Sequence, residues 1–249
     1  MISSEPLTEQ LAISGAAIVD TFGNQFCTKV NKMEGISDLM KQAGEGDTEA
    51  QLELATLYHE GKEVEKDSEQ AVRWWKVAAR NGNAIAQCNL GLMYKYGDGI
   101  DQNLNLAVKW YLASAAQGVV AAQYNLGELF ENPDYEKRDF EEAHKWFLAA
   151  AKQDDIDAQY MLGLLYDNEE WDNRDECNAA DWYKKAAEQG HAYAMFNLAL
   201  LYLEGSDKIR NRKKAIHWFI RAAEKNDRSA QEIIDDLNLE EDNLIHINP

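Results

Sequence analysis

The sequence predicts an all-α solenoid built from helix pairs that recur every 36 residues. An alanine recurs at this spacing, a tryptophan recurs at the same spacing, and no insertion interrupts either series. The alanines are Ala50, Ala86, Ala122, Ala158, Ala194 and Ala230. The tryptophans are Trp74, Trp110, Trp146, Trp182 and Trp218. A fixed period of roughly 20–50 residues indicates repeats that stack on their neighbours and share one core.

The first helix of each repeat begins just before the recurring alanine. Four residues later the sequence has Leu54, Leu90, Leu126, Leu162 and Leu198, which lie on the same helical face as the alanines. The next position is always small, as Ala55, Gly91, Gly127, Gly163 and Ala199, which predicts that a second helix approaches closely there. We therefore expect Gly163→Leu to overpack the fourth repeat. Gly163→Ala is expected to be mild, because glycine is a poor residue inside a helix.

The second helix contains the recurring tryptophan within an apolar stripe. An aromatic residue follows each tryptophan, as Trp75, Tyr111, Phe147, Tyr183 and Phe219. Residues that cap helices precede this helix, namely Asp67, Asn103, Asp139, Asp175 and Asn211. Asp47, Asn83, Asp155 and Asp227 supply the same function before a first helix. Val119 and His191 are the exceptions in that position.

Three segments carry a family resemblance: residues 122–130, 158–166 and 180–190 resemble Sel-one-like repeats, a 36-residue relative of the tetratricopeptide repeat. The resemblance implies a right-handed superhelix of antiparallel helix pairs. It also implies an adaptor or scaffold role without catalytic activity. The full repeats are predicted at residues 47–82, 83–118, 119–154, 155–190 and 191–226.

The ends of the chain depart from the repeat. Residues 36–46 match a lone second helix, and residues 227–238 match a terminal helix with a polar outer face. Apolar residues in residues 1–35 fit one helical face, which predicts a helical extension. Residues 239–249 are predicted to form an acidic, flexible tail.

The composition favours a cytoplasmic protein with a basic partner. The formal net charge is −19, from 44 acidic and 25 basic residues, which disfavours binding to nucleic acid or to anionic membranes. The same negative charge attracts a basic protein and speeds its association with the chain. Cys27, Cys88 and Cys177 are widely spaced, which argues against a disulfide framework. No apolar run reaches the roughly 20 residues of a membrane-spanning helix.

The sequence predicts no catalytic, metal or cofactor site. It lacks paired-cysteine, phosphate-loop and zinc-protease motifs, and its histidines occupy unrelated positions of the repeat. We expect no cofactor and interpret the histidines as surface or packing residues. An enzyme that uses residues 1–35 remains the least favoured alternative.

A binding surface is predicted on the first helices. Residues two, six and nine positions after the repeat alanine point about 180–240° away from it, toward the inner, concave side of the solenoid. The candidate partner-binding residues there are Leu92, Tyr124, Glu128, Glu131, Tyr160, Leu164, Asp167, Phe196 and Leu200. Tyr135 and Trp171, which lie in acidic loops at the same repeat position, are a second candidate contact. The alternative for the large apolar residues is packing between repeats.

The leading hypothesis is therefore a non-enzymatic adaptor that binds a basic partner protein on its concave face. The alternative is an immunity protein that neutralises a secreted toxin by direct binding, a role known among members of the family that the chain resembles.

Overall fold

The computed structural model describes residues 32–225 and 229–235, and the chain divides between Asp139 and Phe140 into two compact units. We call these the first and the second unit. The first unit contains α1 (Lys32–Glu45), α2 (Thr48–Glu60), α3 (Ser68–Arg80), α4 (Ala84–Tyr96), α5 (Leu104–Ala115) and α6 (Val120–Glu131). The second contains α7 (Phe140–Ala151), α8 (Ile156–Asp167), α9 (Glu176–Glu188), α10 (Ala192–Glu204) and α11 (Arg212–Ala223). All regular elements in the described ranges are helices, which confirms the predicted all-α solenoid.

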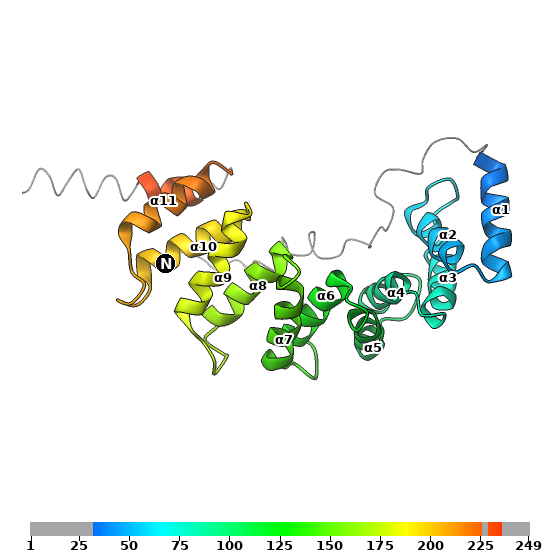
Figure 1. The fold of residues 1–249 in the computed structure, drawn as a ribbon, viewed down its shortest axis with the longest axis horizontal. Coiled ribbons are helices and arrows are strands. Elements are labelled where there is room, and N and C mark those ends of the chain that lie inside the picture. The colour runs from blue at the N-terminus through cyan, green and yellow to red at the C-terminus, as the bar shows by residue number, and fades with distance from the viewer. Residues whose placement is uncertain (1–31, 226–228, 236–249) are drawn as a thin grey trace, which may run out of the picture. The chain divides into compact units, whose positions relative to one another are not determined.

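Each helix packs against the helix that follows it within its unit (Figure 1). We call α2, α4, α6, α8 and α10 the first helices of the repeats, and α3, α5, α7, α9 and α11 the second helices. In the second unit, α8 packs on α9 and α10 packs on α11, while α8 also contacts α10. The first helices of neighbouring repeats therefore lie next to each other in that unit.

Side-chain caps define where the helices begin. Asp67 accepts a hydrogen bond from the backbone N–H of Gln70, and Asn103 accepts one from Leu106, as the sequence predicts. Val119 makes no such bond. His191 was expected to be an exception too, and this expectation is wrong, because its Nδ1 atom accepts from the N–H of Ala194 at 3.1 Å. An imidazole nitrogen thus replaces the carboxylate or amide oxygen of Asp47, Asn83 and Asp155.

Within each unit, the core lies between the helices that pack on each other. The repeat alanines of the first five first helices are at most 5% exposed. The aromatic residue after each repeat tryptophan is fully buried: Trp75, Tyr111, Phe147, Tyr183 and Phe219 are at most 1% exposed. Most of the tryptophans themselves are only half-buried. The second aromatic position, rather than the tryptophan, therefore forms the centre of the core.

Buried glutamines connect successive repeats, a feature that the sequence pattern did not indicate. Gln51 donates from Nε2 to the carbonyl of Ala43, and Gln87 donates to the carbonyl of Ala79 at 3.1 Å. These carbonyls lie in the last turn of the preceding helix, where backbone acceptors have no partner within the helix. Each glutamine thus satisfies a helix end inside the stack.

The small residue that follows the repeat leucine in each first helix has less space around it than the sequence indicated. A β-carbon at Gly163 would lie 2.5 Å from Cε1 and 2.8 Å from Cγ of Tyr183, and one at Gly91 would lie 2.6 Å from Cδ1 of Tyr111. The expectation that Gly163→Ala is mild is therefore wrong. The tyrosine ring already occupies the space that a methyl group needs.

The helices at the two ends differ in extent from the sequence expectation. The helix expected at residues 36–46 is α1, which begins at Lys32. Residues 229–235 are helical, with Ala230 buried, inside the predicted range 227–238. Residues 1–31 of the proposed N-terminal extension and the proposed tail at residues 239–249 lie outside the described residues. None of the described helices has the length and apolar character needed to cross a membrane.

Candidate functional site

The large apolar residues predicted to line the first-helix surface are mostly buried. Leu92 is 1% exposed, Tyr124 is 8% exposed and Tyr160 is 6% exposed, so the expectation that they are available to a partner is wrong. Phe196 is half-buried and packs edge-on against Phe219, with ring centroids 5.6 Å apart. Packing between helices and between repeats, the alternative that the sequence left open, explains these positions.

Most of the charged residues of the first helices are exposed or half-buried. These five helices contain eight acidic residues and a single lysine, Lys95. The acids are Glu49, Glu53, Glu60, Glu128, Glu131, Asp157, Asp167 and Glu204. The second helices have the opposite balance, with eleven lysines and arginines against six acids. Charge is therefore segregated by helix type rather than spread evenly over the repeats.

In the first unit, one acid of this surface is neutralised within the chain. Nζ of Lys95 forms an ion pair and hydrogen bond with Oε2 of Glu128 on the next repeat, and the lysine side chain is only 10% exposed. Nζ of Lys95 also lies 5.1 Å from the ring centroid of Tyr96, which is 51% exposed. The pair leaves Glu128 one-third exposed, and Tyr96 is a large exposed apolar group beside it.

Glu131, at the end of α6, has an environment that disfavours its charge. Burial raises the pKa of its carboxyl group, Arg138 opposes this shift and Glu128 adds to it, and the resulting pKa is about 7. The carboxyl group is therefore partly protonated at neutral pH in the folded chain. In the unfolded chain it ionises near its ordinary value of 4.5.

Glu131 should make the first unit less stable as the pH rises. The raised pKa means that the folded state binds more protons than the unfolded state between the two pKa values. The stabilising contribution is thus complete below pH 4.5 and is lost as the pH rises through about 7. We expect Glu131→Gln to have a smaller fall in melting temperature between pH 5 and pH 8 than the wild-type chain. Equal pH dependence of the two proteins, measured by circular dichroism, would contradict this assignment.

In the second unit, the predicted surface residues Leu164, Asp167 and Leu200 are half-buried. Burial raises the pKa of Asp167, and Arg174, whose Nη2 lies 3.9 Å from Oδ1, opposes that shift. Sequence reasoning missed Tyr193, which is 45% exposed in the first turn of α10. The sequence did contain a signal for it, because the equivalent position is not aromatic in the other repeats, which have Glu49, Ile85, Ala121 and Asp157.

Tyr135 and Trp171 anchor loops and are not free contact residues. Tyr135 is 4% exposed and Trp171 is 5% exposed, so the expectation of an accessible aromatic pair is wrong. Nε1 of Trp171 donates to Oε1 of Glu141 in the preceding second helix at 2.9 Å. The hydroxyl of Tyr135 makes a long, 3.5 Å contact with Oδ1 of Asn105 at the equivalent position. Both loops therefore fold back onto the preceding repeat.

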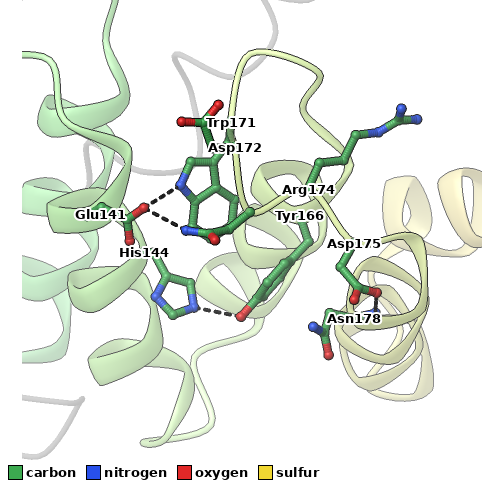
Figure 2. Close-up of a pocket in the computed structure, with 9 residues that line it drawn as sticks. Glu141, His144, Tyr166, Trp171, Asp172, Arg174, Asp175 and Asn178 are labelled. Carbon is green, nitrogen blue, oxygen red and sulfur yellow. Dashed lines mark hydrogen bonds between the residues drawn. The ribbon is translucent and has the colours of Figure 1, made fainter.

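The Trp171 loop borders an open pocket of about 490 Å³ in the second unit (Figure 2). His144 and Tyr166 are hydrogen-bonded across it at 2.9 Å, and the ring centroids of Tyr166 and Trp171 are 5.1 Å apart. Glu141 accepts a hydrogen bond from Nε1 of Trp171 (Figure 2) and a second one from Nδ2 of Asn173 at 2.8 Å. These contacts hold the loop in place.

The pocket lacks the arrangement that nucleophilic catalysis needs. Burial lowers the pKa of His144, against an opposing effect of Glu141, and burial raises the pKa of Tyr166. Both groups are therefore uncharged near neutral pH, and they bond to each other rather than to a nucleophile. Cys177 is exposed, and burial raises the pKa of the Cys88 thiol to about 12. Among the described residues, no group of three or more potential metal ligands comes together.

Comparisons with known proteins identify the repeat. The sequence profile described as Sel1 repeat matches residues 48–83, 84–119, 120–155, 156–191 and 192–227. A Sel1 repeat protein from Oxalobacter formigenes has 29% sequence identity and a TM-score of 0.67, over 83% of this chain and 87% of that one. Among functionally curated proteins, the comparison finds no match.

Two other solved structures are more distant. The protective antigen c5321 of uropathogenic Escherichia coli has 26% identity and a TM-score of 0.49, over 83% of this chain and 52% of that one. The immunity protein Pa5087 of Pseudomonas aeruginosa has 20% identity and a TM-score of 0.43, over 88% of this chain and 82% of that one. At these TM-scores the likeness carries no information about function.

Proposed function

The chain belongs to the Sel1 repeat family, and we propose that it is a non-enzymatic scaffold whose first helices bind a basic partner protein. Sel1 repeats generally serve as interaction scaffolds without catalytic activity. The proposal adds the surface and the charge of the partner to this general role.

The segregation of charge between the two helix types carries the proposal. The first helices have eight acids against one lysine, and that lysine is paired with Glu128. Opposite charge on a partner would accelerate encounter and orient it toward these helices. In the second unit, half-buried Leu164 and Leu200 and exposed Tyr193 add the apolar contact area that stable interfaces need.

Neutralisation of a basic toxin is the narrower form of the same proposal. An immunity protein would use this acidic surface to cover a basic site on its toxin. It would also bind that one toxin far more tightly than other basic proteins. A scaffold would hold its partner without inhibiting an activity. Adding the chain to an assay of the captured protein's activity separates the two.

The test compares equal changes of charge on the two helix types. One variant combines Glu53→Gln, Glu60→Gln and Glu204→Gln on first helices, and its control combines Glu69→Gln, Asp181→Asn and Glu188→Gln on second helices. All six residues are at the surface, so both variants should fold. We expect the first variant to associate several-fold more slowly with its captured partner and to lose much of the salt dependence.

The control variant should associate as the wild-type chain does. The measurement is the association rate by surface plasmon resonance at two salt concentrations, after capture of partners from lysate. Loss of binding in both variants would mean that overall charge matters rather than the first helices. If both variants associated with the partner as the wild-type chain does, the partner would bind to another surface.

A further inference from the structure

Tyr193 is an exposed aromatic residue that the repeat itself does not require. It is 45% exposed, and the same repeat position holds glutamate, isoleucine, alanine and aspartate in the other four repeats. A side chain of this size at the surface of a first helix exposes apolar area to water. Such residues are the common anchors of protein interfaces.

Tyr193 lies beside a stacked pair of rings, the buried Tyr160 and the half-buried His191. Tyr160 and His191 stack with centroids 4.4 Å apart and planes 26° apart. The Tyr193 ring lies 6.5 Å from Tyr160 and 6.1 Å from His191. The position of Tyr160 is constrained by Tyr183 beneath it, at 6.0 Å, and His191 is held by its bond to the N–H of Ala194. The three rings therefore form a pre-organised aromatic cluster at the surface of the second unit.

A carboxylate borders this cluster. Oδ1 of Asp157 lies 3.5 Å from Nε2 of His191, and the Asp157 side chain is 42% exposed. Asp155 is close enough for Asp157 to raise its pKa, in addition to the larger effect of burial and against the hydrogen bond from Ala158. The first helices α8 and α10, which carry the cluster, contain no lysine or arginine. Negative charge therefore accumulates where the aromatic rings reach the surface.

We propose that Tyr193 and Asp157, held in place beside the stacked rings of Tyr160 and His191, form a binding site for an arginine side chain of a basic partner segment. The inference rests on the proposed function and names the group that this part of the surface recognises. A guanidinium group is planar, so it stacks on the exposed Tyr193 ring while its N–H groups pair with the Asp157 carboxylate. A lysine ammonium is a compact, strongly hydrated charge that gains less from the ring.

The probe is an N-acetylated, C-amidated hexa-arginine peptide, with hexa-lysine as the peptide of equal charge. Binding to the full chain is measured by fluorescence anisotropy at low salt. We expect Tyr193→Ala to weaken hexa-arginine binding about three- to fivefold and to change hexa-lysine binding little. The double variant Tyr193→Ala and Asp157→Asn should weaken it about tenfold. Tyr193→Phe, which keeps the ring, should bind as the wild-type chain does.

Tyr96→Ala is the matched control, because Tyr96 is an equally exposed tyrosine on a first helix of the other unit. It should leave hexa-arginine binding unchanged. The proposal of an arginine site would be wrong if Tyr193→Ala and Tyr96→Ala bound hexa-arginine with equal affinity. It would also be wrong if Tyr193→Ala lost the same factor in affinity for hexa-arginine and for hexa-lysine. The proposed function would survive that result if the first-helix acid variant still weakened peptide binding. If the acid variant bound both peptides as tightly as the wild-type chain, the proposed function would fail as well.

Discussion

Replacing Gly163 with alanine is expected to destabilise the second unit by about 1–3 kcal/mol, because the new methyl group has no space. Its β-carbon would lie 2.5 Å from Cε1 of Tyr183, a ring that is 1% exposed and cannot rotate into solvent. Either the ring or the helix α8 must move, and both are tightly packed. The expected result is a melting temperature lower by roughly 2–10 °C, measured by circular dichroism or calorimetry.

Gly44→Ala is the matched control for this prediction. Gly44 lies in α1, and a β-carbon there would meet no atom within 4 Å. The same substitution should therefore be neutral or stabilise by up to about 1 kcal/mol through helix propensity. A Gly163→Ala variant that melts at or above the wild-type temperature would show that α8 and α9 are separated more widely than the structure has them.

Replacing Trp171 with alanine is expected to cost about 3–5 kcal/mol, the loss typical of a buried tryptophan. The indole contacts both His144 and Tyr166, with ring centroids 5.3 Å and 5.1 Å away. Its Nε1 atom also donates to Glu141 on the preceding second helix. Truncation thus removes the contact that fastens the loop after α8 to α7 (Figure 2). The free energy of unfolding in urea measures the effect.

Trp171→Phe separates the hydrogen bond from the packing. It keeps an aromatic ring but removes the donor to Glu141, which still accepts from Asn173 at 2.8 Å. We expect this variant to lose about 1 kcal/mol from the hydrogen bond and a further part from the smaller ring. If Trp171→Ala were as stable as the wild-type chain but failed to bind the partner, Trp171 would be a contact residue, as the sequence first indicated.

Much of the fold was predictable because it depends on local chemistry and strict periodicity. Asp67 and Asn103 cap second helices with short side chains that bond to backbone N–H groups a few residues away. Such bonds depend on the adjacent sequence alone. The alanine and leucine stripes likewise follow from the 36-residue period, since each repeat must bury the same face. His191 was missed as a cap because histidine seldom takes that place.

The candidate site was predictable in its charge and not in its aromatic residues. Glu128 and Asp167 are on the first-helix surface, as the helical spacing predicted, because carboxylates are costly to bury. Tyr160 occupies the same kind of position but is buried, since a neighbouring repeat supplies His191 to cover its ring. Tyr193 was overlooked because no other repeat has an aromatic residue there.

The helix pairs, their period and most of their caps follow from residues close together in the chain, and the acidic balance follows from the composition. Which aromatic residues are buried, which loops fold back and which small positions tolerate a methyl group depend on contacts between distant residues in the folded chain. Ala199 and Gly163 occupy equivalent positions, and nothing in the period distinguishes them. At Gly163 the ring of Tyr183 occupies the space of a β-carbon, and this contact joins side chains of separate helices that meet only in the folded chain.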